Sequence, residues 1–433
     1  MQDLGNRSIR LELGVVFQTT NDPMKKLLTI LAVAALALSP LSAHEPEPPA
    51  DKALLASAIN DFGMRLYDEV ATGEGNACVS PVSVSMALLM ALMGAEGETA
   101  DELVRVLGLA DAAGDWQPAR VQRALAGLMQ DLEASKGKAD FNIVNDMWGQ
   151  QGYGFLKAYR QRLLDSGSQL HEVDFKRSPE QARQTINDYI KKQTEGRIDG
   201  LMPKGSVTRL MRQVLTNAVY FKARWSQVFT PALTKDCSFT LLGGDVIKVP
   251  TMHQQGDLYY ADNDKLQVVR MGYASSSYEM VIVLPRSGQD LDVARAALRP
   301  GALEVLMGRA KSQLVQLALP KFEFRSSYDR MAKALQRMGL TLAFDAARSD
   351  FSGVNGGVAP LQIGSVVHKT YLKVEEEGAE AAAATAVISC DGCVSAPDPA
   401  VVFSADRPFV LAIRDSRTNS LLFVGEVTDP RSK

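Results

Sequence analysis

Histidine and cysteine are the side chains whose chemistry most narrows the function of this sequence. The 433-residue chain has only four histidines, His44, His171, His253 and His368, and they lie far apart. A zinc site commonly draws on several histidines, and a hydrolytic nucleophile needs a base that a third group orients. Histidines this few and this scattered argue against both kinds of site. We therefore expect the protein not to be an enzyme.

The four cysteines include one closely spaced pair, Cys390 and Cys393, which flank Asp391-Gly392. Such a pair can be redox-active or can supply half of a zinc site. No second pair and no histidine close in sequence accompany it, so we expect no metal. A disulfide between Cys390 and Cys393 stays open for an oxidising compartment. Cys78 lies in an apolar run and is expected to be buried, whereas Cys237 indicates no role.

The most informative stretch is the alanine-rich segment from Glu375 to Val387. Alanine and glutamate favour helix, so an ordinary surface helix is one interpretation. Read with a period of two, however, one face is small or apolar and carries no charge, so a sheet could bury it cheaply. A segment with both tendencies suits a loop that changes state. The uncharged face consists of Ala379, Ala381, Ala383, Thr385, Val387 and Ser389.

Composition places the chain among globular proteins rather than fibrous or disordered ones. It is 46% hydrophobic and 22% charged, with 47 Lys and Arg against 50 Asp and Glu and a net charge of -3. Because there is no overall positive field, we expect no nucleic-acid partner. No linker rich in proline or serine divides the chain, which favours one large domain over two.

A pattern near the N-terminus is typical of a secretory signal peptide. Lys25-Lys26 supplies a short basic start, Leu27 to Leu38 an apolar run, and Ala43 a small residue at the exit. The apolar run is shorter than the ~20 residues that a membrane-spanning helix needs. An uncleaved membrane anchor is the alternative interpretation.

The leader also bears on where the mature protein begins. Translation can start at Met1 or at Met24, because the signal pattern begins only at the second methionine. We expect residues 1–43 to be a leader that contains the signal peptide, and residues 44–53 to be a flexible tail. The mature protein is expected to be secreted or periplasmic, with no membrane contact once the signal is removed.

Hydrophobic periodicity predicts helices in the first half of the chain and strands in the second, which indicates an α+β fold. The run 82–93 is apolar on nearly every side, so we expect a buried helix that begins after Ser80-Pro81. The expected helices are residues 54–70, 82–93, 98–107, 121–133, 155–165, 179–193 and 327–338. The expected strands are residues 213–221, 257–260, 268–271, 278–284, 314–324, 366–374, 409–415 and 420–427.

A series of short motifs, in fixed order from about Leu54 to Pro430, resembles the serpin family. Any one of these motifs is weak, but their joint order and spacing are specific. The matching residues are Asn76, Ser80, Pro81, Ser83, Gly94, Ala95, Gly97, Thr99, residues 217–225 (NAVYFKARW), 319–322 (LPKF), 350–353 (DFSG), 367–369 (VHK), Asp406, Pro408, Phe409, Ile413, Leu422, Phe423, Gly425 and Pro430.

The resemblance implies an α+β serpin fold in one large domain over residues 54–433. About eight to nine helices would surround three β-sheets and present an exposed reactive-centre loop at about residues 376–400. It further implies an irreversible, suicide-type inhibitor: a protease cleaves the loop, the loop inserts into the main sheet, and the serine or cysteine protease stays trapped as an acyl-enzyme. A non-inhibitory serpin that is a protease substrate, carrier or chaperone is the alternative. We expect a monomer without a cofactor.

The same resemblance assigns a hinge at the start of the loop. Inhibitory serpins usually have Thr or Ser directly after the hinge glycine Gly378, where this chain has Ala379. Because alanine is small, we expect insertion to survive this departure. The hinge residues are Glu376, Glu377, Gly378, Ala379, Glu380, Ala381, Ala382, Ala383, Ala384 and Thr385.

The usual loop length, counted from the hinge, puts the scissile bond between Gly392 and Cys393. The loop is longer than the family's common length, so the interval from Ile388 to Ala396 stays open. No Lys or Arg lies between Lys373 and Arg407, which favours elastase-, subtilisin- or papain-like target proteases over trypsin-like ones.

Two further sets of residues carry over by position. The family's shutter, where the main sheet opens, corresponds to Ser83, Asn217 and His368. The family's breach, where insertion begins, corresponds to Trp225, Lys321 and Glu376.

Overall fold

The computed structural model describes residues 9–10, 16–17, 49–71, 75–109, 116–328, 331–377 and 400–431. The chain divides into two units, Met1–Pro49 and Ala50–Lys433. In the first unit β1 (Ile9–Arg10) pairs antiparallel with β2 (Val16–Phe17). No helix of the described residues is long and apolar enough to cross a membrane. All that follows concerns the second unit.

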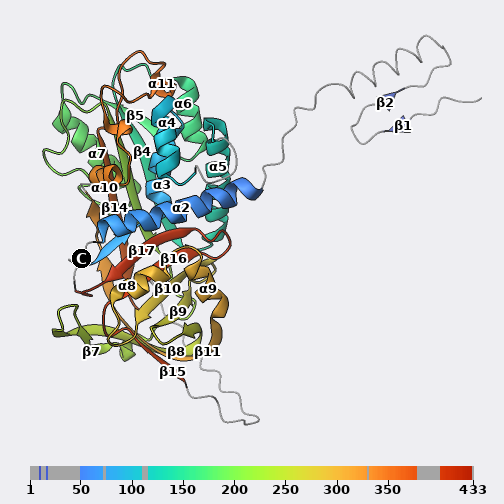
Figure 1. Cartoon of the computed structure of the whole chain (residues 1–433), viewed down its shortest axis with the longest axis vertical. Helices are drawn as coiled ribbons and strands as arrows, with labels where there is room; N and C mark the ends of the chain where they lie inside the picture. Colours follow the sequence, from blue (N-terminus) through green and yellow to red (C-terminus); the bar gives the residue numbers. More distant parts are fainter. Residues whose placement is uncertain are drawn as a thin grey trace, which may run out of the picture. The chain divides into compact units, whose positions relative to one another are not determined.

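Ten α-helices occur among the described residues, slightly more than the eight to nine that the resemblance implied, and periodicity did not reveal the short α8, α9 and α11. Figure 1 shows α4, α5, α6 and α11 gathered at one end of the second unit and β7, β11 and β15 at the other. The helices are α2 (Pro49–Val70), α3 (Pro81–Leu92), α4 (Gly97–Val106), α5 (Pro118–Ser135), α6 (Lys157–Asp165), α7 (Pro179–Gln193), α8 (Leu291–Ala297), α9 (Ala302–Arg309), α10 (Met331–Arg337) and α11 (Ser352–Asn355). Two 3-10 turns, η1 (Pro231–Leu233) and η2 (Leu342–Phe344), add to them.

The central helix α3 lies in the largest of three hydrophobic clusters among the described residues. Every residue from Pro81 to Leu92 is buried, as its all-round apolar sequence predicts. Ser80 caps the helix, since its hydroxyl accepts a hydrogen bond from the Ser83 N–H. The helix contacts strands of both large sheets, so those sheets share this core.

The first large sheet has six strands, and the pairing in it that spans the most sequence joins β14 to β6. Its order is β12-β14-β6-β4-β5, and β13 pairs additionally with β14. Strands β14 and β6 are parallel neighbours. The strands are β4 (Asp140–Gln150), β5 (Gln169–Val173), β6 (Gln213–Lys222), β12 (Phe322–Phe324), β13 (Ser327–Tyr328) and β14 (Ser365–Val374).

The second large sheet has nine strands in the order β15-β11-β8-β9-β10-β16-β17-β3, and β7 pairs with β8. The 17-residue β8 joins its two halves: one end of β8 pairs with β7, the other with β9. The expected three sheets are therefore bonded as two large ones. The strands are β3 (Ala77–Val79), β7 (Lys235–Thr240), β8 (Val246–Asp262), β9 (Leu266–Gly272), β10 (Tyr278–Pro285), β11 (Lys311–Pro320), β15 (Val401–Ser404), β16 (Phe409–Asp415) and β17 (Leu421–Val427).

The α+β fold class is confirmed, and the described first half is mostly helical and the second mostly β, as predicted. Strands β4 and β5, which lie among the early helices, were not predicted, because they carry too many polar residues to show a strand pattern. Two element predictions need correction. The single strand expected over residues 314–324 is divided at Lys321 between β11 and β12, which belong to different sheets. The helix expected from Ser327 begins only at Met331, because Ser327–Tyr328 pairs with β14 as β13.

The turn between α5 and β4 supplies a test of this packing. Gly137 has a φ of 57°, and a Cβ there would lie 1.5 Å from the Ser275 carbonyl oxygen. Gly205 has a φ of 79° with nothing within 4 Å of its virtual Cβ. Gly205→Ala should cost only the left-handed backbone strain of about 1–2 kcal/mol. Gly137→Ala should cost that plus about 1–3 kcal/mol for the displaced turn, seen as a larger drop in thermal unfolding midpoint. Equal drops would contradict this packing.

Candidate functional site

The boundary between β14 and β6, here called the seam, pairs two strands that lie far apart in the sequence. Ser365 to Leu372 of β14 pair in parallel with Val214 to Phe221 of β6. All ten residues of β6 except Lys222 are buried, and six of the ten in β14 are buried at alternate or adjacent positions. The seam is therefore closed and covered on both faces.

A network of buried polar side chains crosses the middle of the seam. His368 and Asn217 are register partners, and the His368 Nδ1–H donates to Asn217 Oδ1. Asn217 Nδ2 donates to Asn145 Oδ1 on β4 at 2.6 Å. Ser83 Oγ of α3 donates to the same Asn145 oxygen at 3.1 Å, and Asn145 Nδ2 donates back to the Ser83 carbonyl at 2.8 Å. Three adjacent strands and the helix beneath them are thus joined.

The His368 ring sets the direction of these hydrogen bonds. Its Nε2 accepts from the Ser80 N–H at 3.2 Å, which leaves the proton on Nδ1. Complete burial lowers the pKa of His368 to about 3, because an apolar interior disfavours the charged ring. The ring therefore stays neutral near pH 7. The Tyr328 ring stacks beside it at a centroid distance of 6.0 Å.

The structure brings Ser83, Asn217 and His368 into one network, as the sequence analysis expected, but through a residue that analysis missed. Asn145 links Ser83 to Asn217, which do not bond to each other directly. A signal existed, since Asn145 interrupts the apolar run around Ile143 and Met147. It could not be used because β4 was not recognised as a strand.

The chain leaving β14, here called the loop base (Glu375–Glu377), is held by backbone bonds from the segment after β6. The Trp225 indole N–H donates to the Glu375 carbonyl at 3.0 Å, and the Trp225 backbone N–H donates to the Glu377 carbonyl at 3.2 Å. The Phe229 N–H donates to the Glu376 carbonyl at 3.0 Å. Trp225 is itself fixed by stacking on Tyr273, with ring centroids 4.5 Å apart.

The Glu376 carboxylate fastens the loop base to the other sheet. It accepts from Lys321 Nζ at 2.7 Å and from Thr234 Oγ1 at 2.8 Å. Burial by itself raises the pKa of Glu376, but the hydrogen bonds from Lys321, the backbone and Thr234 outweigh it and lower that pKa below its ordinary value. Trp225, Lys321 and Glu376 thus meet at the loop base, and Thr234, which sequence analysis missed, joins them.

The remaining predicted site residues lie outside the described residues. These are the hinge from Gly378 to Thr385, the scissile pair Gly392 and Cys393, and the disulfide candidate Cys390. Of the other cysteines, Cys78 is buried as expected, and burial raises the pKa of its thiol to about 12. No group of three or more metal-ligating side chains occurs in the described part of the chain.

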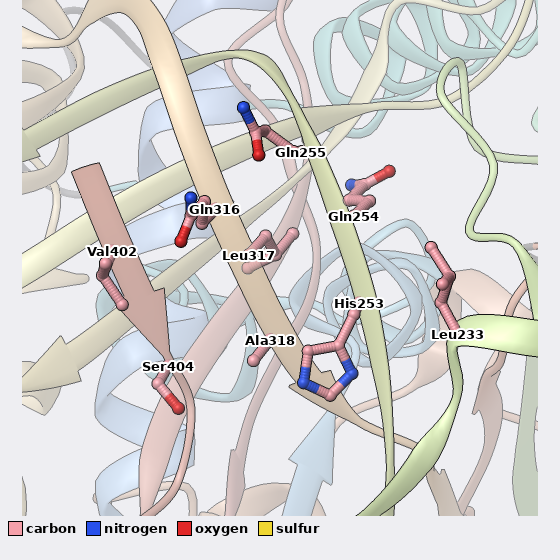
Figure 2. Close-up of a pocket in the computed structure, with 9 residues that line it drawn as sticks. All are labelled: Leu233, His253, Gln254, Gln255, Gln316, Leu317, Ala318, Val402 and Ser404. Carbon is pink, nitrogen blue, oxygen red and sulfur yellow. The ribbon is translucent and has the colours of Figure 1, made fainter. Parts of the chain in front are cut away.

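An open pocket of about 400 Å³ lies on the nine-stranded sheet (Figure 2). His253, on β8, points its Nε2 toward Cys237 Sγ at 3.9 Å and is hydrogen-bonded through Nδ1 to the Thr251 carbonyl. The lining of the pocket consists of Leu233, His253, Gln254, Gln255, Gln316, Leu317, Ala318, Val402 and Ser404.

The fold is a mixed α+β domain with a closed parallel seam and a loop base anchored at its end. The family model described as "Serpin (serine protease inhibitor)" matches residues 57–430. The chain belongs to the serpin family.

Known relatives agree with this assignment. An uncharacterized serpin-like protein of Thermococcus kodakarensis is 37% identical over 87% of this chain and 86% of its own length. The leukocyte elastase inhibitor of Bos taurus is 33% identical over 82% of this chain and 93% of its own. The solved structure of human thyroxine-binding globulin with bound hormone has a TM-score of 0.78 at 28% identity, covering 88% of this chain and 100% of that one.

The first prediction from this site concerns the bridging residue Asn145. Asn145→Ala leaves the buried Ser83 hydroxyl and the Asn217 amide without their shared acceptor. Each unpaired buried group costs about 1–3 kcal/mol, so the thermal unfolding midpoint should fall by several degrees. The control is Asn142→Ala on the same strand, whose side chain donates to the Gln193 carbonyl at the surface and takes no part in the seam network. Similar midpoints for the two variants would refute the bridging role.

The second prediction concerns the carboxylate of Glu376. Glu376→Gln replaces a charge-assisted bond to Lys321 and should lower stability by about 1–2 kcal/mol near pH 7. Because the folded-state pKa of Glu376 is below its ordinary value, this stability is present above about pH 4.5 and is lost as pH falls further. The control is Glu375→Gln, which removes a more exposed pair with Lys373. Chemical unfolding of wild type, Glu376→Gln and Glu375→Gln at pH 7 and pH 3.5 measures the size and the sign of the effect. If the difference in unfolding free energy between wild type and Glu376→Gln is unchanged at pH 3.5, the prediction is wrong.

Proposed function

We propose that this serpin is an irreversible, suicide-type protease inhibitor. The target cleaves the reactive-centre loop at about residues 376–400, and the loop inserts at the seam before the acyl-enzyme is hydrolysed. The observation that carries the proposal is the closed parallel seam between β14 and β6, with the loop base at the end of β14. A serine or cysteine protease would be held as a distorted acyl-enzyme.

The directions of the strands make insertion of the loop energetically favourable. Strands β14 and β6 are parallel, so a chain that leaves β14 and turns back between them runs antiparallel to both. One parallel ladder is then replaced by two antiparallel ladders, which are slightly more stable per residue. The proposed roles follow from this: the shutter of Ser83, Asn217 and His368 resists opening, and the breach of Trp225, Lys321 and Glu376 is where opening starts.

The layers packed on the two faces of the seam determine which residues an inserted loop can have. Helix α3 and its polar network lie on one side, and Val214, Ala218 and Val367 form an apolar cluster with α7 on the other. A strand inserted between such layers must bring small, uncharged side chains. The uncharged face from Ala379 to Ser389 meets that requirement.

The target class is proposed from the loop sequence. The absence of Lys and Arg between Lys373 and Arg407 disfavours trypsin-like enzymes, and the small and apolar residues favour elastase-, subtilisin- or papain-like ones. Similarity to a leukocyte elastase inhibitor supports an elastase-like target. We also propose that the mature chain is exported, on the pattern of residues 24–43, and acts as a monomer.

A non-inhibitory role is the second candidate, because human thyroxine-binding globulin shares this fold at similar coverage. Under that candidate the loop would be cut without trapping the protease. The hinge discriminates between the two, since insertion tolerates small uncharged residues and this hinge has them at alternate positions.

The test is incubation of the full chain with elastase-, subtilisin- and papain-like proteases, followed by denaturing gels and mass spectrometry. Inhibition predicts a complex that survives denaturation and a released C-terminal peptide that begins at the scissile bond. Ala383→Arg should abolish the complex and turn the protein into a substrate, because it puts a charge on the uncharged face. Ala384→Arg, on the face that already has Glu380, is the matched control and should trap at least tenfold more enzyme.

Two other outcomes would overturn the proposal in different ways. Cleavage with no complex but a large rise in thermal stability means that the loop inserts too slowly to trap these enzymes. Cleavage with no gain in stability means that the loop does not insert, and the non-inhibitory candidate stands.

A further inference from the structure

A second cluster of side chains with a titratable group lies under α7, apart from the polar network of the seam. His171 of β5 lies between two aromatic rings: it stacks on Trp148 of β4 with centroids 4.4 Å apart, and Tyr189 of α7 lies 4.6 Å away on a tilted plane. Trp148 and Tyr189 also meet edge to face at 5.4 Å. One imidazole therefore touches both the sheet and the helix that covers it.

A buried carboxylate lies beside this imidazole. Asp146 Oδ2 is 3.4 Å from His171 Nε2, and the Asp146 side chain is only 5% exposed. Its other oxygen accepts from the Gln169 N–H at 2.7 Å. His171 Nε2 is buried yet makes no hydrogen bond of acceptable geometry. The carboxylate is thus close enough to attract a charged ring but does not bond well to a neutral one.

The groups that face His171 come from both elements packed against it. Strand β4 contributes Asp146, and α7 contributes the Tyr189 hydroxyl, which hydrogen-bonds to Asp146 and whose pKa burial and that carboxylate raise. On β5 itself the neighbouring Glu172 is paired with Arg160 of α6. A protonated ring would gain the Asp146 charge and two aromatic faces, both of which favour a cation. Histidine is the side chain that gains a proton between pH 5 and 8.

Helix α7 covers the seam as well as the edge of the sheet. Its buried residues Ala182, Ile186 and Ile190 share one apolar cluster with Trp148 of β4 and with residues of β6 and β14. The loop after α7 also receives a hydrogen bond from Lys369 of β14 at the Asp199 carbonyl, 2.8 Å away. A strand entering the seam would widen it by about 4.8 Å, so α7 must shift over at least one of the strands that it covers.

We propose that His171 is a proton-operated clasp for α7: when protonated it fastens the helix to β4 and β5 through Asp146, Trp148 and Tyr189, and when neutral it loosens that contact. Resting on the proposed function, the consequence is that acid slows loop insertion, so that more of the protein is cleaved as a substrate at pH 5.5 than at pH 8.

Hydrogen exchange on the full-length chain tests the clasp without any protease. His171→Gln removes the titrating ring, and amides of α7 should exchange about three- to tenfold faster in this variant than in wild type at pH 5.5. The ratio should return toward one at pH 8. Comparison at equal pH cancels the intrinsic pH dependence of exchange. His253→Gln, a half-exposed histidine on β8, is the matched control and should leave α7 unchanged.

A second variant keeps the proposal falsifiable if His171→Gln does not fold. Tyr189→Leu leaves His171 and Asp146 on the sheet but removes the ring on α7, and it should also abolish the pH-dependent part of the protection. A variant-to-wild-type ratio that is the same at pH 5.5 and pH 8 would mean that the ring only packs, and the clasp would be rejected.

The yield of the protease complex is then measured at pH 5.5 and pH 8 as a ratio of variant to wild type. This measurement tests whether acid slows loop insertion. PH-dependent protection of α7 without any complex would reject the inhibitory function and leave the clasp standing. Complex formation with pH-independent protection would reject the clasp and leave the inhibitory function standing.

Discussion

The structure depends on one constraint: the buried pairing between β14 and β6 contains polar side chains, and each of them needs a hydrogen-bond partner. Unpaired polar groups at the seam would make it unstable. The protein meets this constraint with a series of hydrogen bonds that runs from His368 through Asn217 and Asn145 to Ser83. Every donor in that chain has an acceptor while the seam is closed, because His368 is held in one neutral tautomer.

The loop base extends the same constraint to the second sheet. Lys321 lies between β11 and β12, where the chain passes from one large sheet to the other, and its ammonium group binds Glu376. Backbone bonds from Trp225 and Phe229 complete the attachment. The end of β14 is therefore tied to both sheets, so the place where the proposed loop departs is fixed by contacts that arise far away in sequence.

Sequence reasoning reached what local composition and motif spacing encode. The buried helix α3 follows from its uninterrupted apolar sequence, and His368 and Asn217 follow from motifs that resemble a family. Strand β4 was missed because Asn142, Asn145 and Asp146 hide its alternation, yet two of those residues are buried because of what they bond to. The fusion of two sheets through β8, and the division of one strand at Lys321, depend on tertiary pairing that no local pattern contains.

The parallel seam also has a consequence for how the chain folds. His368 and its partner Asn217 are 151 residues apart in sequence, whereas a segment just after β14 could pair back on β14 as a local hairpin. Closing the short loop costs less chain entropy than closing the long one, and distant pairings form slowly. The bonds from Trp225 to Glu375 and Glu377 attach the end of β14 to the segment after β6. The pairing that the structure shows at the seam is therefore the one whose closure costs the chain more entropy.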